Sequence, residues 1–344
     1  MITFIDEIRQ QSGALVDLVR AYDADGSEGE KLASIVKERG INEFVFTGMG
    51  SSTFVGYVAR TLLSRKGIRA SVCETKEYIS TNSKTMREDS MLFLVSQSGT
   101  SKEIMDFCAD HLKSDHNVGI ITNYPDQPLY GHGEVKFLIH AGQEYNTSSK
   151  SFTNTVATVL YICNVIIKSK GFEPYDFSGI VSEYAKIVED LVNADSGALS
   201  EFLADAAYVC YIGGGASYCT AHQAELITEE AANMFSTRYL PAQFLHGPIE
   251  LINERFYAIA FDFSDETRAE IDRAVDSVIS FGGKICVLTN RDIELDDPRF
   301  LSIKIPVENE FYAPLVEIVP IELFINQLGL KRGKNPGILS RVHK

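Results

Sequence analysis

The chain of 344 residues has no extended run of lysine or arginine. Its 32 basic residues are outnumbered by 47 acidic ones, which gives a formal net charge of −15. Binding to a nucleic-acid backbone needs a basic stripe, so this composition disfavours nucleic acid as a partner. Any anionic ligand must be held by a local site.

Cysteine is scarce and scattered along the chain. The cysteines stand singly, mostly inside apolar runs, with no CxxC pattern and no metal-ligand spacing. They are Cys73, Cys108, Cys163, Cys210, Cys219 and Cys286. This usage is typical of reduced core residues in a cytoplasmic protein, and it predicts no metal site.

Features of secreted and membrane proteins are also missing. The opening stretch MITFIDEIRQ has acidic residues where a signal peptide has a basic region followed by an apolar one. No apolar segment approaches the roughly 20 residues that a membrane helix requires. We therefore expect a cytoplasmic protein that makes no contact with a membrane.

The dinucleotide fingerprint GxGxxG does not occur at either glycine-rich turn. TGMGSS (Thr47 to Ser52) and GGGAS (Gly213 to Ser217) both lack the third glycine of that fingerprint. The sequence therefore argues against a nicotinamide cofactor, and we expect no cofactor of any kind.

An internal repeat organises what is present. FVFTGMGSS (Phe44 to Ser52) matches VCYIGGGAS (Val209 to Ser217) at an offset of 165 residues. VGIITN (Val118 to Asn123) matches ICVLTN (Ile285 to Asn290) at an offset of 167 residues. Two motifs in the same order at nearly the same offset indicate a duplicated fold.

Both copies alternate short β-branched or aromatic runs with longer amphipathic stretches, which is typical of a parallel sheet flanked by helices. We predict an α/β protein with two doubly wound parallel-sheet domains, flavodoxin-like in type and related by internal duplication. The predicted strands are 43–47, 70–74, 91–95, 117–122, 135–139, 208–212, 256–261, 284–288 and 302–305. The predicted helices are 52–65, 101–113, 149–167, 216–234, 266–280 and 315–329.

The domain organisation follows from this alternation and from length. A chain of this size with 45% hydrophobic residues can bury two cores of ordinary domain size. The predicted parts are a helical arm over 1–38, a first domain over 39–170, a linker helix over 171–200, a second domain over 201–330 and a C-terminal tail over 331–344.

The loop SQSGTS follows the predicted strand 91–95 and suits a phosphate monoester. Its hydroxyl and amide groups can donate hydrogen bonds, Gly99 allows close backbone approach, and the next helix offers free N–H groups. An ordinary helix N-cap is the alternative, because serine and threonine commonly start helices. In the second copy the equivalent stretch is DFSDET, whose Asp262, Asp265 and Glu266 would repel a phosphate. We expect one phosphate site per chain, in the first domain.

The ordered set GMGSS, SQSGTSKE, TSSKSFT and FLHGPIELI resembles the sugar isomerase (SIS) domain family. Within that family the chain is similar to the tandem-SIS group, which includes the isomerase half of glucosamine-6-phosphate synthase and the fructosamine-6-phosphate deglycases. The resemblance runs from about residue 25 to the C-terminus. It implies a sugar-phosphate substrate and an active site completed by a second subunit, hence a homodimer or higher homo-oligomer.

Residue by residue, the resemblance also implies a site. The phosphate would be bound by Ser52, Ser96, Gln97, Ser98 and Ser101. The sugar would be lined by Gly50, Ser51, Thr147, Ser148, Ser149, Lys150 and Arg341. For Lys150, a surface lysine or a cap of the following helix is an equal alternative.

Glu230 and His246, sixteen residues apart, match the family's catalytic pair. Moving a proton between C1 and C2 of an open-chain sugar requires a carboxylate base, and ring opening or imine collapse requires an acid that titrates near neutrality. The alternatives are that Glu229 and Glu230 are simply solvated on a helix, and that His246 only bonds backbone in a turn.

Departures from the family pattern bear on the reaction. The synthase carries a lysine one helical turn before its catalytic glutamate, and this chain has Ile227 there. The family's second sugar-site lysine falls on Arg341, and an arginine does not readily form a Schiff base. Because the sequence starts MITFIDE, we also expect no counterpart of the synthase's ammonia-producing domain ahead of the SIS pair.

These departures favour a fructosamine (Amadori) 6-phosphate deglycase, whose substrate already contains the amine. Two alternatives remain open. One is a phosphosugar isomerase or deaminase that uses the same Glu–His pair. The other is a non-catalytic phosphosugar-binding sensor.

Overall fold

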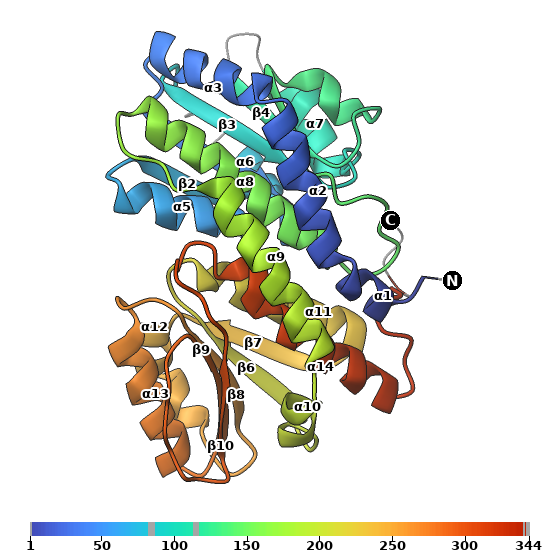
Figure 1. Ribbon diagram of the computed structural model, residues 1–344, viewed down its shortest axis with the longest axis vertical. Coiled ribbons are helices and arrows are strands. Elements are labelled where there is room, and N and C mark those ends of the chain that lie inside the picture. Colours follow the sequence, from blue (N-terminus) through green and yellow to red (C-terminus); the bar gives the residue numbers. More distant parts are fainter. Residues whose placement is uncertain (1, 82–86, 113–116, 340, 342–344) are drawn as a thin grey trace. The chain divides into compact units, whose positions relative to one another are not determined.

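The computed structural model describes residues 2–81, 87–112, 117–339 and 341 (Figure 1). The chain forms two compact units that interleave along the sequence. Unit 1 consists of Met1–Gln10, Glu144–Ser149 and Tyr184–Lys344, and unit 2 consists of Gln11–Gln143 and Lys150–Glu183. Each unit contains one five-stranded sheet, and each is described separately below.

The unit 2 sheet has the strand order β2-β1-β3-β4-β5, with every neighbouring pair parallel. Its strands are β1 (Glu43–Gly48), β2 (Arg69–Glu74), β3 (Ser90–Val95), β4 (Asn117–Thr122) and β5 (Val135–Leu138). All residues of β3 and β4 are buried, as expected for central strands that are covered on both faces. The predicted doubly wound fold is confirmed for this unit.

Helices cover both faces of this sheet. They are α2 (Gln11–Ala24), α3 (Ser27–Glu38), α4 (Ser51–Phe54), α5 (Gly56–Arg65), α6 (Thr75–Thr81), α7 (Lys102–Asp110), the 3₁₀ helix η2 (Pro128–His132) and α8 (Lys150–Ser169). Leu92 and Leu94 of β3 join a core cluster with Phe107 of α7. Phe93 points to the opposite face, because side chains alternate along a strand, and stacks on Phe46 with ring centroids 4.8 Å apart. The helix predicted over 101–113 ends at Asp110, and residue 113 lies outside the described residues.

Helix α8 corrects one sequence-based expectation. It is long and apolar enough to cross a membrane by length and composition, although no segment was expected to be. In the structure 89% of that stretch is buried inside the protein, and α8 packs against α2, α3 and α5. Its apolar character is explained by this central position in the helix layer of unit 2 (Figure 1).

The unit 1 sheet repeats the architecture, with the order β10-β9-β8-β6-β7 and all neighbours parallel. Its strands are β6 (Tyr208–Ile212), β7 (Phe235–Tyr239), β8 (Tyr257–Asp262), β9 (Lys284–Thr289) and β10 (Phe300–Lys304). Counted along the chain, the first strand of each sheet again lies between the second and the third. The internal duplication predicted from the sequence is therefore present in the topology.

Strand β7 was missed by the sequence analysis, which extended the preceding helix to residue 234. The helix ends at Ala232 because Asn233 adopts the left-handed conformation, with φ of 47°. The strand that follows, FSTRY, lies at the edge of the sheet, and its Phe235 is 74% exposed. An edge strand with an exposed aromatic residue lacks the buried apolar pattern on which strand prediction depends.

The helices of unit 1 also cover two faces. They are α1 (Phe4–Arg9), α10 (Ala198–Phe202), α11 (Ser217–Ala232), α12 (Pro241–Leu245), the 3₁₀ helix η3 (Pro248–Leu251), α13 (Arg268–Ser280) and α14 (Pro314–Lys331), while α9 (Phe177–Asn193) runs from unit 2 into unit 1. Helix α14 packs against α1, α10 and α11, and α12 packs against α13. The predicted linker helix therefore corresponds to α9 and α10.

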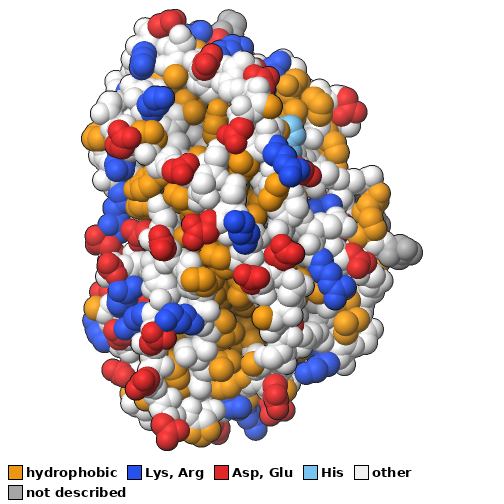
Figure 2. Space-filling view, viewed as in Figure 1, with side chains coloured by type: hydrophobic (Ala, Val, Ile, Leu, Met, Phe, Trp, Pro, Cys, Tyr) orange, Lys and Arg blue, Asp and Glu red, His pale blue; other side chains and the backbone are white. Residues whose placement is uncertain are grey.

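Charged side chains of both signs occur together on one face of the protein. Figure 2 shows lysine and arginine interspersed with aspartate and glutamate on the face that it presents. All six cysteines are free thiols, five of them buried and Cys73 partly exposed.

Candidate functional site

The loops that follow β1 and β3 lie side by side at the carboxyl edge of the unit 2 sheet. Gly48, the last residue of β1, is paired with Val95, the last residue of β3. The chain passes from β1 to β2 on one side and later returns to β3 on the other, so the strand order reverses here. Open α/β sheets bind ligands at this reversal point. The motifs TGMGSS and SQSGTS therefore share the position where a ligand is expected.

The serine side chains of the SQSGTS loop are hydrogen-bonded within the loop. The hydroxyl oxygens of Ser96 and Ser101 lie 2.9 Å apart, and Thr100 donates its hydroxyl to Ser98 Oγ at 3.1 Å. Ser101 holds the N-cap position of α7, yet its side chain makes no capping hydrogen bond. The loop is therefore not an ordinary helix cap. Its hydroxyls are arranged at the start of α7, where the helix dipole favours negative charge.

The backbone of this loop is fixed at several points. Gly99 has φ of 68°, and a Cβ atom there would lie 2.7 Å from Gln127 Cβ, so glycine is required. The Gly99 carbonyl accepts the N–H of Leu129 at 3.2 Å, and the Gln97 carbonyl accepts the N–H of Asn123 at 3.1 Å. A loop held in this way can bind a small anion without rearranging.

The neighbouring TGMGSS turn supplies three further predicted site residues, Gly50, Ser51 and Ser52. Gly50 has φ of 52° and precedes α4, which begins with Ser51 and Ser52. Thr53 donates its hydroxyl to the carbonyl of Gly48 at 2.6 Å and so closes the turn. Ser51 and Ser52 are half-buried, and they belong to the same unit and the same sheet edge as the SQSGTS loop.

The corresponding loop of unit 1 carries a buried carboxylate, the side chain of Asp262. Asp262, the last residue of β8, is fully buried and accepts hydrogen bonds from Arg291 Nε at 2.6 Å and Thr289 Oγ1 at 3.0 Å. Arg268 lies 3.4 Å from the same carboxylate and also pairs with Asp265. The buried Asp262 of DFSDET is therefore compensated by arginine side chains, and the exposed Asp265 pairs with one of them.

A second group of predicted site residues meets in unit 1. Thr147 donates its hydroxyl to Glu230 Oε2 at 2.8 Å, although the two residues are 83 positions apart. Gln223, two turns earlier on α11, donates its amide to the carbonyl of Ser148 at 3.1 Å. Glu230 is half-buried whereas Glu229 is exposed. The alternative that both glutamates are simply solvated therefore does not hold for Glu230.

The segment Glu144–Ser149 is held by both ends of the chain. Glu7 of α1 is fully buried and accepts the backbone N–H groups of Tyr145 at 2.6 Å and of Asn146 at 3.2 Å. It also accepts the side-chain amide of Asn146 at 2.8 Å. The N–H of Thr147 donates to the carbonyl of Gly337 in the C-terminal tail at 2.9 Å. Thr147 is thereby placed by backbone contacts on two sides.

Sequence reasoning did not find Glu7 or Gln223. For Gln223 a signal existed, because its position seven residues before Glu230 puts the two side chains on one face of α11. For Glu7 no signal existed, since its partners are mainly backbone N–H groups, which every residue except proline offers.

Three other predicted residues occupy different environments. Ser149 is fully buried, and its hydroxyl donates to Glu144 within the same segment at 3.2 Å. Lys150 is only 5% exposed at the start of α8, so the structure excludes the alternative of a surface lysine. Arg341 is exposed. Residues 340 and 342–344 of the predicted tail lie outside the described residues.

His246 lies at the C-terminal end of α12 and is exposed. Its backbone N–H donates to the carbonyl of Gln243 at 3.1 Å. The next residue, Gly247, has φ of 140°, which only glycine adopts readily. The exposed imidazole is accessible to a ligand or to another molecule.

The C-terminal half of α11 is acidic around Glu230. Glu225 pairs with Arg238 of β7, and burial raises the pKa of Glu225 despite that arginine. Burial, and then the charge of Glu225, raise the pKa of Glu229. The charge of Glu225 therefore opposes the ionisation of Glu229 on this part of the helix.

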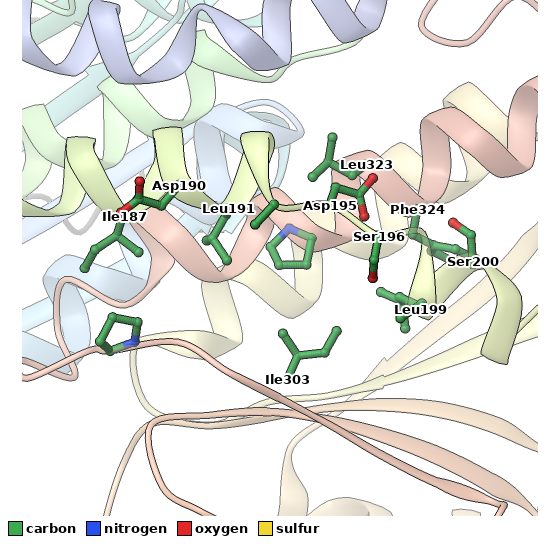
Figure 3. A pocket seen from close by; sticks show the side chains of 14 residues that line it. Ile187, Asp190, Leu191, Asp195, Ser196, Leu199, Ser200, Ile303, Leu323 and Phe324 are labelled. Atoms are coloured by element: carbon green, nitrogen blue, oxygen red, sulfur yellow. The ribbon is translucent and has the colours of Figure 1, made fainter.

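A separate cavity of about 320 Å³ lies in unit 1 between α9, α10, β10 and α14 (Figure 3). Leu191, Leu199, Ile303 and Phe324 give it a mainly apolar wall, and Asp195 contributes a carboxylate. Asp195 is already engaged, since Gln327 donates to it at 2.9 Å. None of the predicted site residues lines this cavity.

A comparison of the sequence with known protein families agrees with the duplicated sheets. The SIS domain matches this chain twice, over residues 39–167 and 202–330. The chain belongs to the SIS domain family. The two matches fall on the two copies of the internal repeat, so this is a tandem SIS protein.

Among curated SIS relatives, glutamine–fructose-6-phosphate aminotransferase (isomerizing) of Geobacillus kaustophilus is 25% identical over 336 residues. The match covers 96% of this chain and 55% of that protein. The chain thus spans about half the length of the curated relatives it matches.

Solved structures show the same tandem SIS fold. The C-terminal domain of glucosamine-fructose-6-phosphate aminotransferase from Francisella tularensis has a TM-score of 0.82 at 21% identity, with 98% of each chain covered. Tagatose-6-phosphate ketose/aldose isomerase from Escherichia coli has a TM-score of 0.79 at 18% identity, with 99% of this chain and 97% of that one covered.

Proposed function

We propose that this tandem SIS protein is a fructosamine 6-phosphate deglycase. It would convert a fructose-amino acid 6-phosphate to glucose 6-phosphate and a free amine. The observation that carries the proposal is the hydrogen bond between Thr147 and Glu230. It joins a carboxylate to the segment that lines the sugar in related proteins, and abstraction of a carbon-bound proton needs such a base.

The SQSGTS loop supports the phosphate end of the proposal. A phosphate monoester at the start of α7 would receive hydrogen bonds from Ser96, Ser98 and Ser101 and from first-turn N–H groups of the helix. Ser52 and Gln97 complete the proposed phosphate ligands. Relatives named for fructose 6-phosphate and tagatose 6-phosphate agree with a phosphosugar.

The proposed chemistry uses two protein groups. Glu230 removes a proton from C1 of the open-chain ketose and gives an enaminol, and a proton is then returned to C2, which leaves an imine at C1. Water adds to C1 of the imine. His246 acts as general acid and protonates the departing amine, so that glucose 6-phosphate and the amine are released.

Two substitutions favour the deglycase over an amine-transferring reaction. Ile227, one turn before Glu230, is fully buried in α11 and supplies no amine. Arg341 carries a guanidinium group, which does not readily form a Schiff base. A substrate that brings its own amine needs neither lysine.

A phosphosugar isomerase or deaminase is the second candidate, favoured by the likeness to the tagatose-6-phosphate isomerase fold. It shares proton abstraction by Glu230 and differs only in the substrate. A non-catalytic phosphosugar sensor is the third, since it needs the phosphate loop alone.

A substrate panel separates these candidates. The purified protein is incubated with fructoselysine 6-phosphate and its aspartate and asparagine counterparts, with fructose 6-phosphate and with glucosamine 6-phosphate, and released glucose 6-phosphate and amine are measured. Release from an Amadori compound supports the deglycase. Turnover restricted to fructose 6-phosphate or glucosamine 6-phosphate supports the second candidate, and binding without turnover supports the sensor.

Glu230→Gln is the decisive variant, and Glu229→Gln is its matched control on the same helix. The first should abolish turnover without unfolding the protein, because Gln cannot accept the proton. The second should keep turnover, because Glu229 is exposed. An active Glu230→Gln variant would refute the proposed role of this carboxylate.

We further propose that the enzyme works as at least a homodimer whose site is completed by a second copy. The exposed position of His246 is compatible with such sharing. Co-expression of Glu230→Gln and His246→Ala chains tests it. Activity in mixed oligomers, with each variant inactive alone, supports a shared site, and a lack of recovery argues that one chain supplies both groups.

A further inference from the structure

The hydrogen bond between Thr147 and Glu230 indicates which side chain orients the proposed base. We propose that Thr147 is the positioning residue of Glu230: its buried hydroxyl holds the carboxylate in the orientation used for proton abstraction. This inference rests on the proposed function. It adds a residue whose part is to orient the base through a hydrogen bond, beyond the sugar-lining place that its position suggests.

A hydrogen bond at its carboxylate restricts the side chain of Glu230. Glu230 lies two residues before the end of α11, and Asn233 follows in a left-handed conformation. A glutamate side chain has several rotatable bonds, and their freedom is lost only when a partner selects one arrangement. Proton transfer from carbon depends on close alignment of the two reacting groups. A fixed donor at the carboxylate therefore affects the rate of chemistry more than it affects folding.

Thr147 has the properties that this task requires. Its side chain is fully buried, so water does not compete for the hydroxyl. A β-branched side chain has few χ1 arrangements, and the hydroxyl is thereby fixed once the backbone is fixed. The backbone is held by the carbonyl of Gly337 on one side and, through Ser148, by Gln223 on the other.

The bond itself is of the stronger kind. A hydroxyl that donates to a carboxylate at 2.8 Å is a charge-assisted hydrogen bond. The acceptor lies beside the carboxylate of Glu229, whose pKa is raised in part by the charge of Glu230. A neutral donor is therefore the group that orients Glu230 without adding charge to this acidic end of α11.

Two nearly isosteric variants test the proposal. Thr147→Val keeps the branched shape and removes the hydroxyl, and Thr147→Ser keeps the hydroxyl. We expect Thr147→Val to lower kcat by about 10- to 100-fold, the size expected for a lost hydrogen bond to a charged group, with little change in KM. Thr147→Ser should recover most of kcat. Wild-type kcat in Thr147→Val, or an equal loss in Thr147→Ser, would overturn the inference.

A double-mutant cycle separates this inference from the proposed function. Urea unfolding of Thr147→Val, Glu230→Ala and the double variant measures the coupling between the two side chains without any substrate, because alanine leaves no acceptor for the Thr147 hydroxyl. A non-zero coupling energy together with a loss of kcat in Thr147→Val supports the inference. If the coupling energy is zero and the wild-type protein is an active enzyme, the inference is overturned while the proposed function stands. If the wild-type protein turns over no phosphosugar, the proposed function fails and the catalytic part of the inference falls with it.

Discussion

Glu317 of α14 is a carboxyl group buried completely inside unit 1. Ser217 donates its hydroxyl to Oε2 at 2.9 Å, and Thr220 donates to Oε1. Burial raises the pKa of Glu317 from 4.5 to about 7, and these two hydrogen bonds oppose only part of that effect. The folded protein therefore keeps a proton on Glu317 over a pH range in which the unfolded chain has released it.

The sign and size of the resulting pH dependence can be worked out. Between about pH 4.5 and about pH 7 the unfolded state binds fewer protons, so the free energy of unfolding falls as the pH rises. The difference of about 2.5 pKa units corresponds to about 3 kcal/mol. Glutamine cannot ionise and still offers an oxygen to Ser217 and Thr220. The variant Glu317→Gln should therefore gain about 3 kcal/mol relative to wild type across this range.

Urea unfolding of both proteins from about pH 4.5 to about pH 8 measures this change. Any constant cost of burying the new amide cancels, because only the change with pH is compared. Glu254→Gln, an exposed glutamate of the same unit, is the control and should show no such change. A difference between Glu317→Gln and wild type that stays constant with pH would refute the reasoning.

Three further substitutions have defined outcomes. Gly99→Ala should lower the free energy of unfolding by at least about 1–2 kcal/mol, because φ is positive there and Gln127 is close. It should also raise KM, and an unchanged KM would contradict a role of this loop in phosphate binding. Glu7→Ala removes the acceptor of three N–H groups, so the free energy of unfolding should fall by about 2–4 kcal/mol and much of kcat should be lost. Full activity would show that the position of Thr147 does not depend on Glu7. Arg291→Met removes one of the hydrogen-bond donors to the buried Asp262 and should lower the free energy of unfolding, measured in urea, by about 3 kcal/mol. Adding Asp262→Asn should restore most of this loss.

The sheets were predictable from sequence because their central strands are apolar along their whole length. Strand β3 is buried at every position, and the glycine-rich or hydroxyl-rich turns that follow such strands mark their ends. The edge strand β7 was not predictable, since Arg238 and the exposed Phe235 interrupt any apolar pattern.

The candidate site could be predicted from the sequence only where short motifs indicate it. The SQSGTS loop and Glu230 stand in recognisable local patterns. Glu7 does not stand in such a pattern, because it binds the backbone of a segment 138 residues away. The side-chain type at Tyr145 gives no indication of that contact. The interleaving of the units, which brings Glu144–Ser149 into unit 1, is likewise a property of the fold and not of any short stretch.

The comparison of the two reversal points explains why the less basic one is expected to bind phosphate. Unit 1 has Arg268 and Arg291 beside the end of β8, and arginine is the side chain best suited to phosphate. Both are already bonded to Asp262, and each makes a second acidic contact, with Asp265 or Asp272. Their charge is therefore compensated within the protein. Among the described residues, the hydroxyls of Ser96, Ser98 and Ser101 bond other hydroxyls of the same loop. We therefore expect the serine-lined helix start of unit 2 to be the better anion site of the two.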